Sequence, residues 1–579
     1  MPPSPVSRQW IIAAPHAQRA ARAASARVSP LIAQVLLNRG VTEPAAVQRF
    51  LNPDFRELLP PETLPGATAA AERLLAAARA GRRIVIYGDY DVDGVTATAI
   101  LWHALRLAEA EVSFYIPSRF DEGYGVNAEA LAQLRADGAD LVVTVDCGIT
   151  AVAEAAVARA LGLELIITDH HQPQAELPDV AAIVHPTACG ASPNPHLSGA
   201  AVAMKVAWAL AQQACGGRAS AEWRELLLDA TAFAALGLVA DVVPLTGENR
   251  VIATYGLKQL AATQNLGLRA LIAVSGLSGK GRYDDYDVGF ALAPRLNALG
   301  RMGHARLAVE MFTRAGAAQA EQIATTLDGQ NRARQSVERA IVKQAEARVV
   351  ERGFDRDSCR AIVLADTGWH PGVIGIVAAR MVDRFHRPTV LIALDNGVGQ
   401  GSGRSVKHFP LHEVLESCSQ HLISHGGHAM AAGLRLKAED VDAFTDAFLA
   451  EAARRLTLQD LCPKLHLDDE VPLGELVVPA VELLQRLAPF GPDNPRVRLA
   501  TTPVTLVGAP RAVGTNGQHL QFSVQQGREQ RKAIAFGRGR DAAALADCPQ
   551  LRVAFEPLIN EFNGQRRVEL RVLDWQPVS

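Results

Sequence analysis

Three aspartates, Asp89, Asp91 and Asp93, alternate along the run Gly88–Gly94, directly after the apolar segment Ile84–Tyr87. In an extended chain, residues at positions i, i+2 and i+4 point to the same face. Carboxylates held this close raise one another's pKa values unless cations lie between them. The run therefore predicts a site for divalent metal ions.

Three further polar clusters each follow an apolar segment, and they bring the total to six aspartates and two histidines. Carboxylates together with an imidazole suit Mn²⁺ or Mg²⁺, and the nitrogen ligand favours Mn²⁺. Six anionic groups are too many for one ion, so we expect two ions that share a bridging aspartate. Two ions can stabilise both the attacking and the leaving oxygen of an in-line phosphoryl displacement. The three clusters are Asp146, the triplet Asp169–His171, and Asp241.

The adjacent histidines His170 and His171 are expected to have different roles. Neighbouring side chains of an extended chain point to opposite sides, so both cannot face one metal ion. We expect one of them to bind metal and the other to reach the phosphate or the leaving group.

A structural role is the alternative for each aspartate taken singly, because aspartate after a strand is a common helix cap or turn residue. Taken singly, Asp146 and Asp241 fit a structural role as well as a metal-binding role. Asp89 could cap a helix or orient the site instead of binding metal. The ordered occurrence of Gly88–Gly94 and Asp169–His171 on one alternating pattern favours the metal site.

The clusters lie in a region, from Gly81 to about Val243, where short β-branched segments alternate with helical ones. This alternation predicts βαβ units and a mainly parallel sheet. Ligands of such sheets bind at the carboxyl ends of the strands, where the clusters lie. The expected strands are Ile84–Tyr87, Val112–Ile116, Leu141–Val145, Leu165–Thr168 and Ala182–Val184, with helices that include Val95–Ala108, Ala128–Ala136 and Ala151–Ala160.

The rest of the chain shows three different sequence patterns. The segment Ala305–Val350 has a continuous helical pattern and predicts a long connecting helix. A second α/β stretch runs from Ala361 to about Leu456. After Pro463, short strands with glycine-rich turns predict a small β-barrel of the oligonucleotide-binding kind. The expected barrel strands are Val504–Gly508, His519–Val524, Lys532–Ala535, Leu551–Phe555 and Arg566–Leu573.

The fold class is therefore α/β, and 579 residues are too many for a single core. We expect an N-terminal helical segment, a parallel-sheet domain, a helical region with the long helix, a second α/β domain and the barrel. Their expected ranges are 1–75, 76–250, 251–350, 351–457 and 463–579.

Composition excludes several classes of protein. The seven cysteines are odd in number and form no CxxC pair, so we expect reduced thiols in a cytoplasmic protein. No apolar run approaches the length of a membrane span, so no membrane partner is expected. The net charge of −3 argues neither for nor against a nucleic-acid partner.

Two further segments could bind phosphate. Gly401–Ser405 offers flexible backbone, a hydroxyl group at Ser402 and a guanidinium group at Arg404, although it could also be a plain turn. The glycines before His428 precede an expected helix, Ala429–Ala432, whose N-terminus would bind an anion. They could equally serve close helix packing.

Basic residues elsewhere have both functional and structural interpretations. Arg119 follows an expected strand and would lie at the carboxyl edge of the sheet. Arg295 and Arg301 could line the substrate cleft or pair with acids. Residues 496–540 carry eight Lys or Arg against the single acid Glu529, which fits a groove that tracks phosphates or a solvated face. Phe522 and Phe536 could stack on bases there, although each is more typical of a core.

At these motifs the chain resembles the DHH phosphoesterase family, and within it the bacterial single-strand-specific 5′→3′ DNA exonucleases. Four segments look like the family motifs: Gly88–Gly94, Val145–Gly148, Asp169–His171 and Val239–Pro244. The likeness extends over nearly the whole chain through Leu36–Gly40, Phe50–Pro53, Ile116–Gly125, Phe290–Arg301, Trp369–Gly375, Gly401–Ser405, Gly426–Gly433 and Pro489–Pro495.

The resemblance implies a role for each site residue. His171 would contact the substrate, Asp89 would support the site, and Asp146 would bridge two Mn²⁺ or Mg²⁺ ions. The 5′ end of the strand would be bound by Arg119, Ser402 and Arg404, and His428 would face the strand near the metals. The implied metal ligands are Asp91, Asp93, Asp146, His170 and Asp241.

The resemblance also implies single-stranded DNA as substrate and a role in recombination and repair, with single-strand-binding protein and a helicase as partners. A phosphodiesterase for short RNA or cyclic dinucleotides is the alternative on the same core. The predicted barrel argues against it, because a dinucleotide needs no domain that tracks a strand. A scaffold that had lost catalysis should lack ligands, and here all are present.

Overall fold

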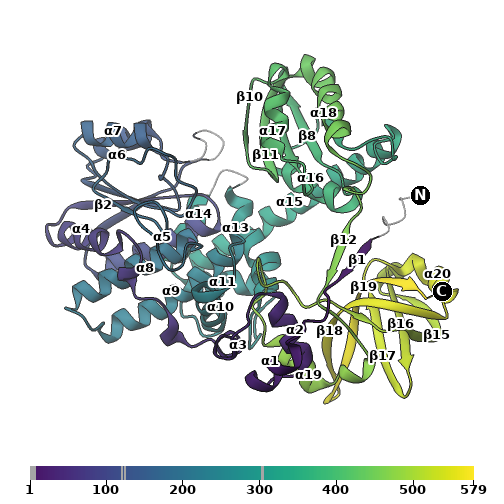
Figure 1. Cartoon of the computed structure of the whole chain (residues 1–579). Helices are drawn as coiled ribbons and strands as arrows, with labels where there is room; N and C mark the ends of the chain where they lie inside the picture. The colour runs from purple at the N-terminus through teal and green to yellow at the C-terminus, as the bar shows by residue number, and fades with distance from the viewer. Residues whose placement is uncertain (1–7, 119–121, 123–124, 301–304, 579) are drawn as a thin grey trace. The chain divides into compact units, whose positions relative to one another are not determined.

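The computed structural model describes residues 8–118, 122, 125–300 and 305–578. The chain forms two compact units. The larger unit comprises Ala13–Gly329 and Asp468–Ser579, and the smaller unit comprises Met1–Ile12 and Gln330–Leu467. Figure 1 labels the elements of both units.

A parallel sheet of five strands lies in the larger unit, in the order β3-β2-β4-β5-β6. All five expected strands are present, which confirms the predicted parallel sheet. Gly88 at the end of β2 pairs with Val145 at the end of β4, so Asp89 and Asp146 leave the sheet side by side. The strands are β2 (Arg83–Gly88), β3 (Glu111–Tyr115), β4 (Leu141–Val145), β5 (Glu164–Thr168) and β6 (Ala182–Val184).

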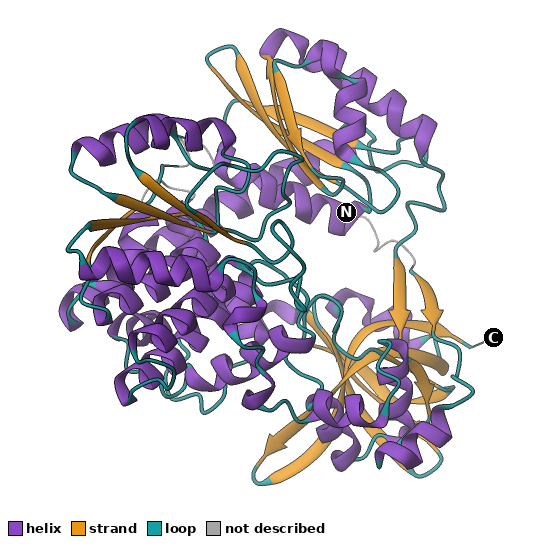
Figure 2. Cartoon of the chain, turned by 60° about the vertical axis from the view of Figure 1, so that its left-hand side comes forward, coloured by secondary structure: helices purple, strands orange, loops and turns teal. Residues whose placement is uncertain are grey.

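Helices cover both faces of this sheet (Figure 2), as its almost continuously apolar central strands require. Ile84 and Ile86 of β2 pack into the core on one face, and Val85 and Tyr87 pack into the core on the other. The first face is covered by α4 (Ala67–Arg79), α5 (Val92–Leu107), α8 (Gly199–Ala214) and α9 (Ala221–Ala240), and the second by α6 (Ala128–Ala136) and α7 (Val152–Ala160).

The helical region that follows differs from its prediction in one respect. The expected helix Ala305–Val350 is two helices, α14 (Ala305–Thr313) and α15 (Ala317–Glu351). The amides of Arg314 and Ala315 both donate to Glu310 O, and the helical ladder stops before Gly316. Glycine is a poor helix former, which explains the break. The other elements here are α10 (Gly247–Gln259), α11 (Leu266–Val274), α12 (Asp285–Asp287), the π-helical segment η3 (Val288–Leu292) and α13 (Ala293–Gly300).

The smaller unit has its own five-stranded sheet, in the order β10-β11-β9-β8-β7. Only β7 and β8 are parallel, and the remaining pairs are antiparallel. The strands are β7 (Ile362–Asp366), β8 (Thr389–Asp395), β9 (Val398–Arg404), β10 (Ser424–Gly427) and β11 (Ala431–Lys437), and the helices include α16 (Pro371–Phe385), α17 (Leu411–Ser417) and α18 (Val441–Arg455). Strands β1 (Gln9–Ile12) and β12 (Lys464–Leu467) form a separate parallel pair.

The prediction of a helix over Ala429–Ala432 is wrong. The segment is the turn and the first residues of a hairpin between β10 and β11. Ala432, Leu434 and Leu436 are buried in alternation, and β11 pairs along its whole length with β9. A period of two buries these side chains in a sheet, which a helix would not. No helix N-terminus binds an anion here.

The C-terminal part of the larger unit is the predicted barrel, with all five expected strands. The barrel closes because β18 pairs with both β15 and β19, while β16 and β17 complete the circuit. Its strands are β15 (Val504–Val513), β16 (His519–Gln526), β17 (Glu529–Ala535), β18 (Gln550–Phe562) and β19 (Gln565–Pro577).

The barrel core also takes in part of the N-terminal segment. Leu31, Ile32 and Leu36 of α2 (Pro30–Asn38) and Phe50 of α3 (Pro44–Leu51) are buried with the barrel residues. The N-terminal helices thus stabilise the C-terminal barrel. Among the described residues, no helix has the length and apolar character needed to span a bilayer.

Candidate metal centre and active site

The three alternating aspartates converge by a different route from the one predicted. Helix α5 begins at Val92, three residues before the predicted start. Asp91 is its N-cap and accepts hydrogen bonds from the amides of Asp93 (2.8 Å) and Gly94 (3.1 Å). Asp93 therefore lies in the first helical turn. The prediction that the three carboxylates share one face of an extended chain is wrong. A strand-to-helix turn brings them together instead.

Asp93 is held by the N-terminus of a second helix. Its two carboxylate oxygens accept hydrogen bonds from Gly199 N (2.5 Å) and Ala200 N (2.9 Å), at the start of α8. Ser198 caps the same helix through Ala201 N. The first amides of a helix carry partial positive charge and lack partners within the helix, so the N-terminus of α8 fixes the Asp93 side chain in place.

Two glycines allow the helices to approach the carboxylates closely. A Cβ atom on Gly199 would lie 2.5 Å from Asp146 Oδ1. A Cβ atom on Gly237 of α9 would collide with Asp93 Oδ1 and lie 2.6 Å from Ala200 Cβ. Any larger residue at either position must displace a carboxylate or a helix.

Asp146 follows β4 in a left-handed conformation, with φ 64°. Its amide donates to Thr168 O (3.0 Å) at the end of β5, which fixes this turn against the neighbouring strand. A positive φ is uncommon outside glycine, although aspartate tolerates it better than most residues. The side chain is buried. The sheet therefore holds Asp146 rigidly at the middle of its carboxyl edge.

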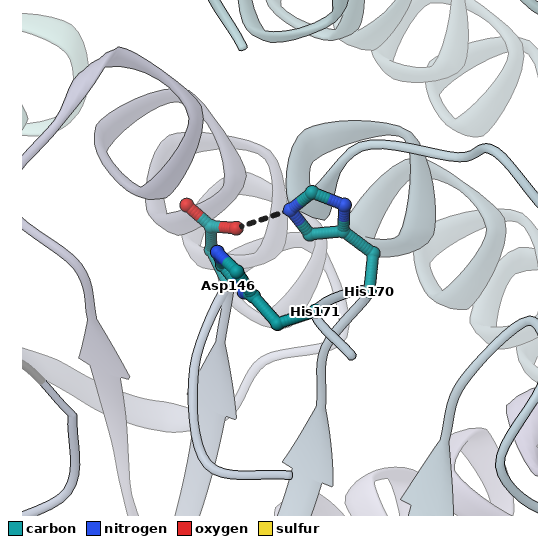
Figure 3. Close-up of side chains that lie close together, drawn as sticks. All are labelled: Asp146, His170 and His171. Carbon is teal, nitrogen blue, oxygen red and sulfur yellow. Dashed lines mark ion pairs between the residues drawn. The ribbon is translucent and has the colours of Figure 1, made fainter. Parts of the chain in front are cut away.

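His170 enters the carboxylate cluster, and His171 lies at its edge. Nε2 of His170 is 3.0 Å from Asp146 Oδ1, 3.6 Å from Asp241 Oδ2 and 3.7 Å from Asp93 Oδ2. Figure 3 shows the Asp146–His170 pair, with His171 beside it. The His170 side chain is 11% exposed and the His171 side chain 41%. His170 is thus the more deeply buried of the two rings, although both lie in one group of possible ligands with Asp146.

Asp169 has a role that the sequence interpretation missed. One of its carboxylate oxygens, Oδ1, accepts hydrogen bonds from the amides of His170 (2.7 Å) and His171 (3.1 Å) and lies 2.7 Å from His171 Nδ1. The other accepts from Ile149 N (2.9 Å). Asp169 thereby orients the His171 ring. Its place as the first residue of the triplet was the available signal, but only the fold reveals what it contacts.

Asp241 caps the C-terminal end of α9. Its amide donates to Gly237 O (2.8 Å), which places the carboxyl group at the end of the helix. The side chain is partly exposed, and the next residue, Val242, has a φ of 59°. Asp241 thus contributes a carboxylate to the cluster from an element far along the chain from β2, β4 and β5.

The possible ligand atoms fall into three groups, each within 4.8 Å. Asp146 and His170 each belong to two of the groups, and of these two only the carboxylate of Asp146 has two oxygens with which to bridge; Asp89 joins a group of possible ligands. Carboxylate oxygens with imidazole nitrogen suit Mn²⁺ and Mg²⁺, and no cysteine belongs to the groups found among the described residues. The donor set therefore fits these ions. The groups are Asp93, His170 and Asp241; Asp89, Asp91 and Asp146; and Asp146, His170 and His171.

The electrostatics of the cluster favour bound cations. Burial, and then the charge of Asp93, raise the pKa of both Asp91 and Asp146. The same causes raise the pKa of Asp241 to about 8. Several buried carboxyl groups resist ionising together unless positive charge compensates them. Divalent ions would supply that charge.

The two histidines have opposite pKa shifts. Burial lowers the pKa of His170, which keeps the imidazole neutral as a metal ligand must be. Burial, the largest single cause, opposes the charge on His171, but the hydrogen bond to Asp169 and the charges of Asp169, Asp241 and Asp89 together outweigh it and raise the pKa of His171 to about 9. His171 is therefore a cation and hydrogen-bond donor at neutral pH.

The predicted phosphate-binding residues other than Arg119 lie in the smaller unit. Ser402 and Arg404 are on β9, and Arg404 Nη1 donates to Ser402 Oγ (3.2 Å) and Gly403 O (2.7 Å). A Cβ atom on Gly375 of α16 would lie 2.8 Å from Ser402 Oγ and 3.1 Å from Arg404 Nη2. His428 is exposed in the turn after β10, where its amide donates to Ala431 O.

Arg295 pairs with an acid, which is one of the two roles that the sequence left open for it. Its Nε and Nη2 atoms are each 3.0 Å from Asp328 Oδ1, and Nη1 donates to Ala291 O (2.6 Å). This geometry favours pairing with an acid. Arg119 and Arg301 lie outside the described residues.

Three family models match parts of the chain. The DHH family, N-terminal domain, matches residues 83–234, which include β2 to β6. The DHHA1 domain matches residues 359–454 of the smaller unit. The RecJ OB domain matches residues 467–574 and so includes nearly the whole circuit of the barrel strands.

Relatives align over almost the whole chain. Single-stranded-DNA-specific exonuclease RecJ of Dickeya dadantii is 35% identical, over 94% of this chain and 95% of that protein. This chain belongs to the RecJ family. RecJ of Bacillus subtilis is 39% identical, over 94% of this chain and 68% of that protein. The crystal structure of RecJ from Thermus thermophilus in complex with Mn²⁺ matches with a TM-score of 0.83 and 32% identity, over 99% of this chain and 80% of that one.

Proposed function

We propose that this chain is a metal-dependent exonuclease that degrades single-stranded DNA from the 5′ end and releases 5′-mononucleotides. One observation carries the proposal: buried carboxylates and one imidazole gather at the carboxyl edge of the sheet, with Asp146 in two ligand groups. The RecJ relatives, named as single-stranded-DNA-specific exonucleases, supply the substrate class.

Asp146 would bridge two Mn²⁺ or Mg²⁺ ions, with the other ligands distributed around it. When bound, such ions supply the positive charge that activates water and stabilises the oxygens of an in-line phosphoryl displacement. The protein's contribution is to fix the carboxylates rigidly, through the strand ends, the α5 cap and the α8 amides. The proposed ligands are Asp91, Asp93, Asp146, His170 and Asp241, with Asp89 at the same edge.

His171 would bind the scissile phosphate or the leaving oxygen. Its Nδ1 lies 2.7 Å from Asp169 Oδ1, and the charged ring would act as a hydrogen-bond donor to the substrate. Asp169 fixes the ring orientation and favours the protonated form. A donor oriented in advance stabilises charge that develops in the transition state without reorganisation.

The 5′ end would be recognised by Ser402 and Arg404, together with Arg119. The hydrogen bond from Arg404 to Ser402 holds a guanidinium group and a hydroxyl group next to each other on β9. This combination suits a terminal phosphate, which accepts several charge-assisted hydrogen bonds. The absence of a side chain at Gly375 gives both groups room.

The barrel would hold the single strand beyond the site. Phe522 is a core residue, as expected, but the expectation that Phe536 is also a core residue is wrong, because Phe536 is 53% exposed. The guanidinium group of Arg571 lies 5.8 Å from the centre of the Phe536 ring. An exposed ring beside a cation can stack on a base and contact its phosphate.

Substrate length separates this proposal from a phosphodiesterase for short RNA or cyclic dinucleotides. The experiment compares, at equal enzyme and Mn²⁺, hydrolysis of a long 5′-phosphorylated DNA strand, a dinucleotide and a cyclic dinucleotide. We expect the long strand to be degraded with a kcat/KM at least about 100-fold above that of either small substrate, because only a strand can use the barrel. A preference for the dinucleotides would overturn the assignment.

We further propose that the enzyme acts in the cytoplasm during recombination and repair, with single-strand-binding protein and a helicase. The cysteines are free thiols, which fits a reducing compartment. The test measures degradation of a long strand coated with single-strand-binding protein, and of a duplex supplied with helicase. We expect both additions to speed up degradation. Slower degradation of the coated strand than of the bare strand would contradict the partnership.

A further inference from the structure

Two aromatic side chains that belong to none of the ligand groups form an exposed stack in the larger unit. The rings of Tyr286 and Phe290 have centroids 4.5 Å apart and an interplanar angle of 23°. Tyr286 is 51% exposed and Phe290 is 69% exposed. Single exposed apolar residues are ordinary, but two large rings stacked together in solvent mark a binding surface.

The backbone that carries the stack is irregular. Tyr286 lies in α12, and Phe290 lies in the π-helical segment η3 that continues it. Val288 and Leu292 are buried on the opposite side of the same segment. Such π-helical turns are rare, and they occur often at functional sites. The segment thus anchors itself with two aliphatic residues while it presents two rings outward.

The acids around the stack are all engaged. Asp284 and Asp287 form a capping box, and Asp287 also pairs with Lys280. Asp285 accepts a hydrogen bond from Phe490 N (3.0 Å) and pairs with Arg496 (2.6 Å), at the base of the barrel. These contacts make the platform rigid and pair two of its three carboxylates, Asp285 and Asp287, with cations.

One cation close to the stack in sequence has no ion-pair partner among the described residues. This residue, Arg282, is exposed and lies four residues before Tyr286. An exposed guanidinium group only four residues from the first of two stacked rings suits a ligand that carries both flat aromatic groups and negative charge. Nucleic acid has this combination.

The platform is joined to the elements that hold the metal ligands. Segment η3 packs against α9, the helix that ends at Asp241. At the other end of the same helical run, Gly300 lies so close to the strand-to-helix turn of Asp89 and Asp91 that a Cβ atom on it would be 2.8 Å from Tyr90 O. The stack therefore belongs to the scaffold of the metal centre and is not an isolated surface feature.

We infer that Tyr286 and Phe290 form a base-stacking platform that binds unpaired bases of the single strand, with Arg282 contacting its phosphates. The inference rests on the proposed function and adds to it a binding site outside the barrel. Stacking tolerates any sequence, because every base has a π-face. It also selects against duplex, whose bases are already stacked on one another.

The test is equilibrium binding of a fluorescent dT oligonucleotide without divalent metal, so that no cleavage occurs. We expect the double variant Tyr286→Ala/Phe290→Ala to raise the Kd about tenfold, within the range measured for base–aromatic stacking. The matched control is Tyr286→Phe/Phe290→Tyr, which keeps both rings and should bind within about twofold of the original chain. Leu228→Ala, which removes an exposed apolar side chain from α9, controls for surface changes.

A second oligonucleotide, with abasic residues in place of thymidines, isolates the stacking contribution. The original chain should prefer the thymidine strand over the abasic strand, and the alanine variant should lose most of that preference. Equal loss of binding to both strands, or unchanged binding to dT, would overturn the platform. Self-association that disappears in the alanine variant while dT binding persists would overturn it too, and would assign the surface to a second copy of the chain.

The platform and the proposed function can fail separately. Mn²⁺ affinity, measured by calorimetry, should be the same in the alanine variant and the original chain, since neither ring is a ligand. If the original chain does not degrade single-stranded DNA, the proposed function fails. If it degrades DNA but the thymidine preference is unaffected by the alanine substitutions, only the platform fails.

Discussion

His171 Nδ1 lies 2.7 Å from Asp169 Oδ1, and the same carboxylate oxygen accepts hydrogen bonds from the two histidine amides of the triplet. One buried acid thus fixes both the backbone turn and the ring that we propose to contact the substrate. The pair divides the triplet between two tasks. His170 enters the metal cluster, and His171 keeps its charge and remains partly exposed.

The substitution Asp169→Asn should separate these tasks. The amide oxygen of the new side chain could still accept hydrogen bonds from the backbone, but the pKa of His171 should fall because the neighbouring negative charge is lost. We expect kcat at pH 8 to fall about 10²–10³-fold, as for loss of an oriented transition-state donor, while the Mn²⁺ dissociation constant changes less than about threefold. Steady-state kinetics and calorimetry measure the two effects. Asp179→Asn, at an exposed surface ion pair, is the control. A variant with full kcat would contradict the role of the pair.

Gly237→Ala should damage the metal centre through packing alone. The new Cβ atom would collide with Asp93 Oδ1 and crowd Ala200, so α9 must move. Overpacking of this kind costs about 1–3 kcal/mol, and we expect Mn²⁺ affinity to fall at least about tenfold. Gly329→Ala is the matched control, because it lies in α15 with no heavy atom within 4 Å of its Cβ position. That change should leave affinity unaltered and raise stability by up to about 1 kcal/mol. Undiminished affinity in Gly237→Ala would contradict the geometry.

Metal binding should release protons. The pKa of Asp241 is raised to about 8 without metal, and burial also raises the pKa of Asp91 and Asp146. The folded, metal-free protein therefore holds protons that the unfolded chain loses near pH 4, so its stability decreases as pH rises from about 4 to about 8.

Bound Mn²⁺ replaces those protons and should reverse the trend, so its apparent affinity increases with pH up to about 8. Calorimetry at pH 7 in two buffers of different ionisation enthalpy counts the protons released. At least one proton per protein is expected. Identical heats in the two buffers would show that the carboxyl groups are already ionised.

Arg404→Ala should impair recognition of the 5′ end more than the chemical step. Loss of a charge-assisted hydrogen bond costs about 1.5–3 kcal/mol, so KM for a 5′-phosphorylated strand should rise about 10- to 100-fold with little change in kcat. KM for a strand with a 5′-hydroxyl group should change little. Arg435→Ala, at an exposed position on β11, is the control. An equal effect on both strands would argue against a terminal-phosphate site.

Sequence reasoning succeeded where the pattern is local and repeated. The parallel strands from β2 to β6 are short, β-branched and apolar, so their positions follow from burial on both faces. The barrel strands were predictable for a similar reason, since turns separate segments of alternating burial. The convergence of the carboxylates and histidines was predictable because strand ends of a parallel sheet share one edge.

It failed where distant contacts decide the structure. Asp93 is bound by amides more than 100 residues later in the chain, so nothing near it indicated a helical turn. Small residues around Ala432 fit a helix or a strand, and pairing with β9 selected the strand. The role of Asp169 depends on the rotamer of a neighbouring ring, and the exposure of Phe536 depends on which barrel face is covered. The spacing of residues along the sequence indicates none of these four features.

One measurement tests the central claim most directly. Single-stranded DNA labelled at the 5′ end or the 3′ end is followed over time with Mn²⁺ and with EDTA, beside a blunt duplex and the Asp146→Asn variant. We predict that the 5′ label leaves first as a mononucleotide, only with Mn²⁺, not from the duplex, and at least about 10³-fold more slowly with the variant. Release of the 3′ label first, or full activity in EDTA or in Asp146→Asn, would contradict the account.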